Sequence, residues 1–100
     1  MKGPKAARTP PSPAYTVKSL VKALGILDCL AESGPEGYTL TALSQKLHLH
    51  INTVHRLLVN LTRQGYVDVN PAKGTYEVGY RVMRMGLKVF NRMDFRRASL

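Results

Sequence analysis

The segment 52–63 combines hydrogen-bonding and positively charged side chains and includes no acid. Its apolar residues recur at the spacing of one helical face: Val54, Leu57, Leu58 and Leu61. With that face buried, a rotation of about 100° per residue points Asn52, Arg56 and Arg63 outward. In the major groove of a duplex, arginine can pair with guanine and asparagine with adenine through the base edges. The segment therefore predicts a helix that reads bases.

Arg56 is the first candidate for a bidentate pair with guanine, and Asn52 or Asn60 for a pair with adenine. Each such pair contributes about 1–3 kcal/mol of discrimination against the wrong base. The alternative is that Arg56 contacts a phosphate or lies on a solvated face. The side chains predicted to meet bases or phosphates are Thr41, Ser44, His50, Ile51, Asn52, Thr53, His55, Arg56, Asn60, Arg63 and Lys73.

A second helix is expected directly before this one. Leu40, Leu43 and Leu47 recur at helical spacing, and Thr39 is placed to cap the first turn. The corner between the two helices is formed by residues 48–50, with the sequence His-Leu-His. Two short helices joined by a tight corner are typical of a helix-turn-helix.

Another helix is expected from Val17 to Glu32, with Thr16 or Ser19 as its cap and Gly-Pro at residues 34–35 after its end. Residues 37–39 predict a short strand between this helix and the helix that begins near Leu40. The apolar residues of the first helix hold a helical period and predict its core-facing side: Leu20, Ala23, Leu24, Leu27, Leu30 and Ala31.

Beyond Gly65, which suits the end of a helix, the period changes from helical to alternating. The alternating runs cover residues 66–69 and 75–78. Turn residues lie between them, so we expect a β-hairpin. A hairpin directly after a helix-turn-helix is the wing of a winged helix, and Lys73 at its tip is placed to reach a phosphate.

Residues 80–93 predict an amphipathic helix. Its apolar side contains Val82, Met85, Gly86, Val89, Phe90 and Met93. Its basic residues lie elsewhere: Arg81, Arg84, Lys88 and Arg92. The apolar side either folds back to complete the core of the domain or meets the same helix of another subunit.

The net charge of +9 is distributed unevenly. Residues 51–100 hold nine lysines and arginines against three acids, whereas residues 15–50 are balanced. Such a surplus attracts a polyanion, nucleic acid first and an anionic membrane surface second. One hundred residues predict a single domain with tails. No apolar run approaches the roughly 18 residues that cross a bilayer, and the one cysteine forms no intramolecular disulfide, so a cytoplasmic location without membrane association is expected.

The sequence shows no group of residues with the spacing of a metal site or of a catalytic site. His50 and His55 are five residues apart, whereas a helical ligand pair is separated by four, and no acid or thiol is adjacent. Cys29 falls beside the apolar stripe of the first helix, which predicts a buried thiol. We therefore expect no metal, no cofactor and no enzymatic activity.

The sequence from about residue 15 to 95 resembles the amino-terminal part of the IclR-type bacterial transcriptional regulators. The likeness rests on residues 17–30, 53–58 (Thr-Val-His-Arg-Leu-Leu), 65–67 (Gly-Tyr-Val), 76–79 (Tyr-Glu-Val-Gly) and 85–86 (Met-Gly). The resemblance implies a winged helix-turn-helix that binds an operator as a homodimer. That family usually has Gly-Leu-Pro at the corner. Here residues 48–50 must turn without glycine and the next helix must start without proline.

We expect three segments. Residues 1–14 predict a disordered basic arm, residues 15–79 a winged helix-turn-helix DNA-binding domain, and residues 80–100 a linker helix toward an effector-binding domain absent from this chain. A small-molecule effector is expected only through that domain. The fold class is mainly α with a small β-hairpin.

The expected function is sequence-specific binding of double-stranded DNA by a bacterial transcriptional regulator, either repressor or activator. The helix at about Ile51–Arg63 would lie in the major groove. The alternatives are a protein-interaction winged helix, and a sequence-independent binder of nucleic acid or of a membrane surface.

Overall fold

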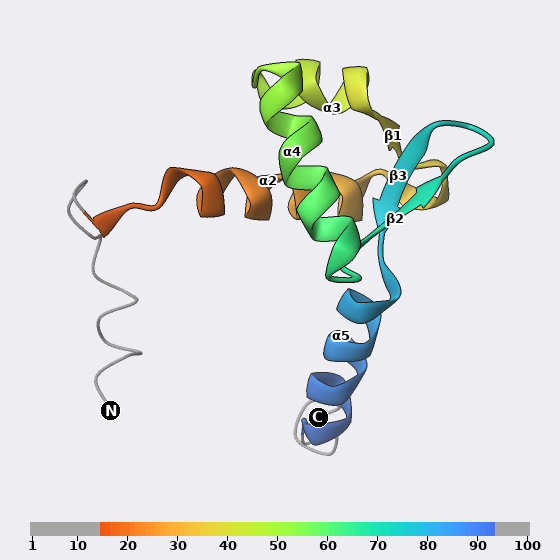
Figure 1. Cartoon of the computed structure of the whole chain (residues 1–100). Helices are drawn as coiled ribbons and strands as arrows, with labels where there is room; N and C mark the ends of the chain where they lie inside the picture. Colours follow the sequence, from red (N-terminus) through yellow and green to blue (C-terminus); the bar gives the residue numbers. More distant parts are fainter. Residues whose placement is uncertain (1–14, 94–100) are drawn as a thin grey trace.

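The computed structural model describes residues 15–93. Its elements follow the chain in the order α2 (Lys18–Glu32), the 3₁₀ turn η2 (Gly34–Glu36), β1 (Tyr38–Thr39), α3 (Leu40–Leu47), α4 (Ile51–Arg63), β2 (Val67–Asn70), β3 (Thr75–Val78) and α5 (Tyr80–Arg92) (Figure 1). The arm predicted for residues 1–14 and the connection beyond residue 93 lie outside the described residues. The mainly α fold with a β-hairpin is confirmed.

Helix α2 occupies the predicted segment, and its predicted core-facing side is right in part: Leu30 is buried and Leu27 packs against the core. Its buried residues are Ile26, Cys29 and Leu30. Leu20 and Leu24 are 55% and 51% exposed, so the prediction that they pack on the core is wrong. The reason is their position on the helix, because they lie on the far side from Ile26. The predicted cap is also wrong: the N-cap is Val17, which makes no side-chain bond.

The core forms where α2, α3 and α4 meet. Leu43, Val54 and Leu58 are fully buried there beside Ile26. Each such side chain contributes about 1.5–3 kcal/mol through removal from water. The remaining predicted leucines of the two later helices pack around this centre, half-buried: Leu40, Leu47, Leu49, Leu57 and Leu61. The predicted apolar faces of α3 and α4 are thereby confirmed. Thr39 caps α3 as predicted, because its Oγ1 accepts the Ala42 N–H at 3.1 Å.

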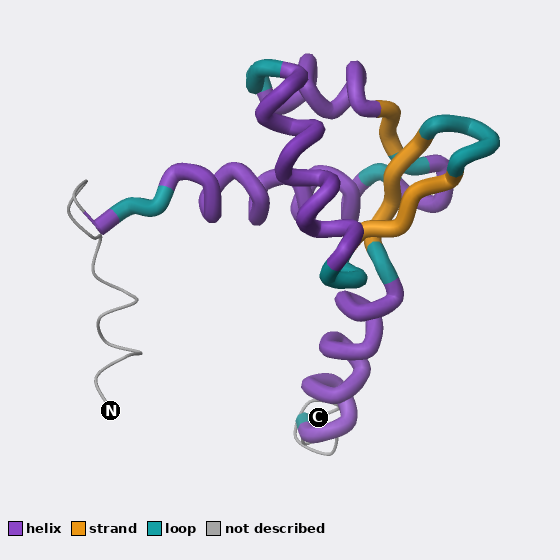
Figure 2. Tube along the Cα trace, in the orientation of Figure 1, coloured by secondary structure: helices purple, strands orange, loops and turns teal. Residues whose placement is uncertain are grey.

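The predicted hairpin forms and gains a third strand. The antiparallel sheet has the order β1-β3-β2 (Figure 2). Strand β2 begins at Val67 rather than at Tyr66 and pairs with β3, while β1 places Tyr38 opposite Tyr76. In the turn, Oδ1 of Asn70 accepts the backbone N–H groups of residues 72 and 73, which holds the tip of the wing in a compact loop.

Helix α5 leaves the body of the domain at an angle (Figure 1). None of its residues is buried and only Val82 is half-buried, so its apolar side does not complete the core. Among the helices between residues 15 and 93, none combines the length and hydropathy that crossing a bilayer requires.

The joint between α4 and α5 is tightly packed. Gly79 donates its N–H to the Tyr66 carbonyl at 2.8 Å. The Arg81 guanidinium donates to the Gln64 carbonyl at 3.1 Å and lies over the Tyr66 ring, 5.2 Å from its centroid. A Cβ atom on Gly79 would collide with the backbone of residues 65–67. The first turn of α5 is therefore fixed against the end of α4.

Replacing Gly79 by alanine tests this joint. We expect Gly79→Ala to lower the free energy of unfolding by about 1–3 kcal/mol, because the backbone must move to admit the methyl group. Gly25→Ala is the matched control, since a Cβ atom there meets no atom within 4 Å. It lies within α2 and should raise stability by about 0.5–1 kcal/mol. Thermal and urea unfolding followed by circular dichroism measure both, and equal stability of the two variants would contradict the packing described.

Candidate nucleic-acid interface

The corner between α3 and α4 is built without glycine. His48 takes the left-handed conformation, with φ 56°, and its N–H bonds back to the end of α3. The Leu49 N–H donates to the Ser44 carbonyl at 3.1 Å, and the Ser44 hydroxyl donates to the Leu49 carbonyl at 2.7 Å. These reciprocal bonds close the turn, so Ser44, predicted to contact DNA, has its hydroxyl committed to the corner.

The start of α4 depends on His50 rather than on a proline. Nδ1 of His50 accepts the Asn52 N–H at 3.1 Å, which satisfies one of the free donors in the first turn. His50 was predicted as a DNA-contacting residue, and the structure gives its ring a capping role. Ile51, at the first position of the helix, is 39% exposed.

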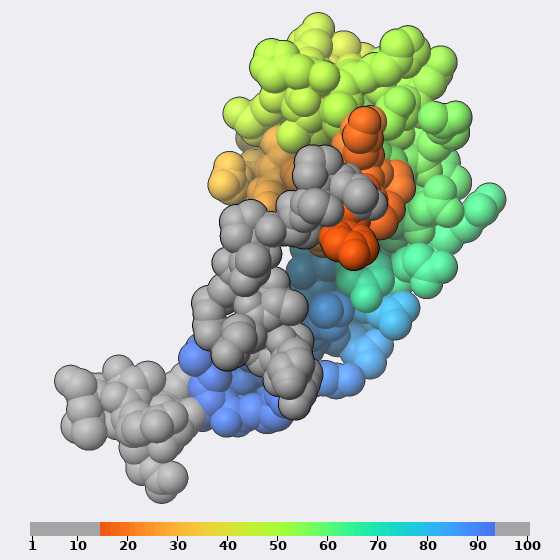
Figure 3. Space-filling view, turned by 90° about the vertical axis from the view of Figure 1, so that its left-hand side faces the viewer, coloured from red at the N-terminus to blue at the C-terminus, as the bar shows by residue number. Residues whose placement is uncertain are grey.

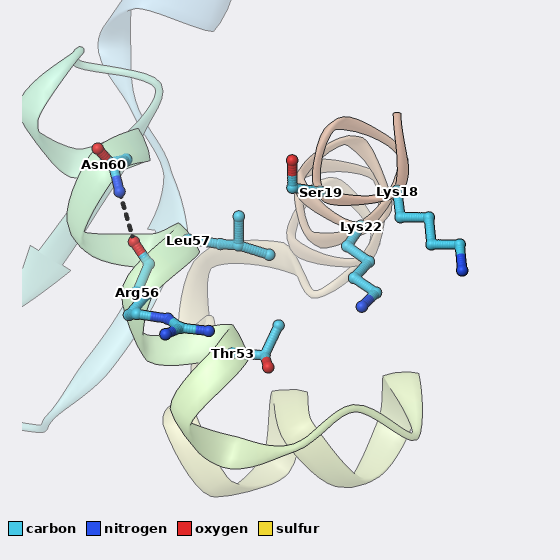
Figure 4. Close-up of a pocket in the computed structure, with 7 residues that line it drawn as sticks. All are labelled: Lys18, Ser19, Lys22, Thr53, Arg56, Leu57 and Asn60. Atoms are coloured by element: carbon cyan, nitrogen blue, oxygen red, sulfur yellow. Dashed lines mark hydrogen bonds between the residues drawn. The ribbon is translucent and has the colours of Figure 1, made fainter. Parts of the chain in front are cut away.

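The outward face of α4 carries the residues that the sequence predicted for it. Asn52, Arg56 and Arg63 are exposed, while Val54 and Leu58 on the opposite face are fully buried. On the flanks, His55 and Asn60 are exposed and Thr53 is half-buried. The side-chain amide of Asn60 donates to the Arg56 carbonyl at 2.8 Å, so one of its donors is already used within the helix (Figure 4).

A groove of about 640 Å³ separates this face of α4 from the first turns of α2. Thr53, Arg56, Leu57 and Asn60 line it from α4, and Lys18, Ser19 and Lys22 line it from α2 (Figure 4). The three residues of α2 were not among the predicted site residues. Their spacing carried the signal, since they precede Ile26 by eight, seven and four positions and so share its face of the helix.

The other flank of α4 meets the sheet. A smaller groove of about 270 Å³ lies there, lined by Val59, Thr62, Arg63, Val69 and Tyr76. Lys73 is exposed at the tip of the hairpin, as predicted, and Thr41 is exposed on α3. Helix α4 therefore lies between the first turns of α2 and the wing (Figure 1), and the space-filling view shows the first turns of α2, in red and orange, beside the green surface of α4 (Figure 3). Asn52 and Arg56 on α4 are exposed to solvent.

The described residues offer no second kind of site. No group of three His, Cys, Asp or Glu side chains within residues 15–93 is arranged to hold a metal ion. Cys29 is buried, and burial raises the pKa of its thiol, which opposes formation of the nucleophilic thiolate. The exposed polar stripe of α4 remains the candidate interface.

An exposed helix after a tight corner, followed by a β-hairpin, defines a winged helix-turn-helix, a DNA-binding class of fold. The comparison with known families gives the narrower assignment. The family described as the IclR helix-turn-helix domain matches residues 19–71, more than half of the chain. The chain belongs to this family.

Known relatives agree with the assignment. XynR of Escherichia coli, an HTH-type transcriptional regulator, is 35% identical over 83 residues, which are 83% of this chain and 32% of that protein. YiaJ of the same species, a DNA-binding transcriptional repressor, is 34% identical over 77 residues, 77% of this chain and 27% of that protein.

Solved structures show the same fold. An IclR transcriptional regulator from Alicyclobacillus acidocaldarius superposes with a TM-score of 0.71 at 27% identity, over 75% of this chain and 30% of that one. HmgR of Pseudomonas aeruginosa gives a TM-score of 0.70 at 28% identity, over 81% of this chain and 33% of that one. The chain spans about a third, or less, of the length of these relatives.

The left-handed residue at the corner is directly testable. His48→Gly should raise the free energy of unfolding by up to about 1 kcal/mol, because glycine adopts this conformation without the steric cost of a Cβ atom. His48→Ala is the control, since it removes the imidazole and keeps the Cβ atom, and it should give no gain. Urea unfolding measures both variants. A loss of stability in His48→Gly would show that the imidazole itself holds the corner.

Proposed function

We propose that the chain reads a specific sequence in double-stranded operator DNA by placing α4 in the major groove. The observation that carries this proposal is the phase of α4. Because its apolar face is buried in the core, the face of α4 that remains exposed to a partner is its polar stripe, which contains no acidic residue. In the proposed complex Arg56 pairs with guanine, Asn52 contacts a neighbouring base, and Lys73 on the wing binds a phosphate.

The wider role follows from the relatives as part of the same proposal. Those relatives are named as transcriptional regulators, and one of them as a repressor. We infer that this chain is the DNA-reading part of a bacterial transcriptional regulator in the cytoplasm. It acts by binding rather than by catalysis. Any small-molecule effector would act on it only through a further domain. Residues 15–79 form the DNA-binding unit in this view, and α5 leads toward that further domain.

We further propose that two copies pair on the operator. The support is an exposed apolar face on the outer side of α2, formed by Val17, Leu20, Val21 and Leu24, which are 51–58% exposed. Helix α5 adds more exposed apolar side chains, among them Met83 and Leu87. Such faces are usually covered by a partner. Two-fold pairing would also set two copies of α4 on half-sites about one duplex turn apart.

Selection of bound duplexes from a random library at about 150 mM salt tests the proposed function, because non-specific binding fades there while base contacts persist. We expect an enriched inverted repeat. Enrichment of no motif, together with binding that disappears as salt rises, would leave a charge-only binder of nucleic acid. Tight binding to a protein that survives removal of Arg56 and Lys73 would favour the protein-interaction alternative.

The role of Arg56 is tested on the selected duplex and on a random one. Arg56→Ala should weaken binding to the selected duplex about 10-fold or more and reduce the preference over random DNA. Arg56→Lys is the matched control for charge, and it should also lose preference because lysine lacks the bidentate fork. Lys73→Ala should weaken both duplexes alike and reduce the salt slope by about one unit. Retention of preference by Arg56→Lys would assign Arg56 to a phosphate.

Pairing is tested by Leu24→Glu. A carboxylate at the centre of the outer face of α2 should shift the chain from dimer to monomer in sedimentation equilibrium, because a charge cannot be buried there without a partner. Gln45→Glu, an exposed change of equal charge on α3, should leave the dimer intact. A monomeric wild-type chain, or a dimer that tolerates Leu24→Glu, would contradict the proposed interface.

A further inference from the structure

The first two turns of α2 reverse the usual arrangement of an amphipathic helix. The core-facing side of this helix is apolar only in its second half, at Ile26, Cys29 and Leu30. Toward the N-terminus the same side continues as Lys22, Ser19 and Lys18. In these turns the apolar side chains lie on the far side. The side directed at α4 is therefore cationic where a packed helix would be apolar.

We propose that Lys18 and Lys22 bind a backbone phosphate of the DNA strand that borders the major groove on the α2 side of α4. This inference rests on the proposed function, since it requires α4 to lie in that groove. It adds a second positioning contact to the one proposed for Lys73, on the opposite flank of the same helix.

The side chains around the groove have the chemistry of a phosphate site. Lys22 extends into the space between the helices, Lys18 stands at the outer end of α2, and the Arg56 guanidinium extends toward the same space from α4 (Figure 4). None of the side chains that line the groove is acidic. Within the part of the chain that the structure describes, no ion pair holds Lys18, Lys22 or Arg56. Their charges are available to an anion.

The placement of α2 selects the DNA backbone as that anion. The major groove is about 12 Å wide and bordered by one phosphate strand on each side. Figure 1 shows the start of α2 on one side of α4 and the hairpin on the other. Thr53 and Asn60 face the first side, while Val59 and Thr62 face the second. With α4 in the groove, one strand meets the lysines of α2 and the other meets the wing.

Lysine suits this role better than it suits base reading. An ammonium on a flexible stem contacts a phosphate as a point charge, without the planar fork that distinguishes bases. Contacts of this kind fix the register of a protein on the duplex and carry no sequence information. Lys18 and Lys22 would thereby hold Arg56 at its base pair while adding equal affinity for every sequence.

The test is the double variant Lys18→Gln/Lys22→Gln in the whole chain, measured by fluorescence anisotropy on the selected duplex and on a random duplex over a range of salt. Neutralising one phosphate contributes roughly 0.9 to the salt slope, so loss of this contact should lower the slope by roughly 0.9 on both duplexes. Relative to binding at about 1 M salt, this slope change corresponds to roughly 5-fold weaker binding at about 150 mM. The ratio between the two duplexes should stay unchanged.

The control is Lys46→Gln/Lys88→Gln, which removes the same charge from α3 and α5, outside the groove. It should change the slope by much less than the first pair does. The melting temperatures of both double variants should match that of the wild type, since the changed side chains contribute nothing to the buried core. An equal slope change in the two double variants would show that only net charge matters and would overturn the inference.

A second experiment locates the phosphate. Uncharged methylphosphonates are placed one at a time along both strands of the selected duplex. Wild-type binding should weaken at a position on each side of the groove, and Lys18→Gln/Lys22→Gln should lose its sensitivity on one strand only, with Lys73→Ala losing it on the other. Unchanged sensitivity in the double lysine variant would overturn the inference while leaving the selected motif, and hence the proposed function, intact.

Discussion

The burial of Val54 and Leu58 against α2 and α3 is the constraint on which the rest of the structure depends. These two side chains fix the rotation of α4 about its own axis. Because successive residues are about 100° apart, Asn52 and Arg56 then have no direction left except outward. A rotation by one residue would bring the Arg56 charge toward the core without a partner, at a cost of several kcal/mol. The rotation of α4 about its axis therefore determines both which residues form the core and which residues form the candidate interface.

The corner and the caps show how the chain reaches this geometry without the residues that usually provide it. His48 accepts a left-handed backbone, Ser44 closes the turn through its hydroxyl, and His50 supplies the cap that starts α4. The Ser44 hydroxyl and the His50 ring were both predicted to contact DNA, and both make hydrogen bonds within the fold instead. The candidate interface is thus left mainly to α4 itself, and in the proposals made above to the elements on its flanks, α2 and the wing.

Much of this arrangement was predictable from the sequence, because strong periodicity marks α3, α4 and the hairpin. The pairing of β1 with β3 was not, since a strand of two residues has no period to detect. Helix α2 carries two apolar stripes, and the sequence alone gave no reason to choose the one with Ile26 over the one with Leu24. For the same reason Lys18 and Lys22 were not predicted as site residues. Only once Ile26 is known to face the core does it follow that these lysines face α4. The capping of α4 by His50 was not predictable either, because residue spacing does not show whether a side chain will accept a backbone N–H in the first turn of a helix.

The two-sided character of α2 has a consequence for how this chain can change over evolution. Between Lys22 and Ile26 the helix passes from its cationic turns to its buried turns on one continuous face. Inserting or deleting a single residue there would rotate the first two turns by about 100° relative to the core. The lysines would turn away from α4, and the outer apolar residues would turn with them. A change of length at this point therefore keeps both faces of α2 in place only when it adds or removes close to a whole number of helical turns.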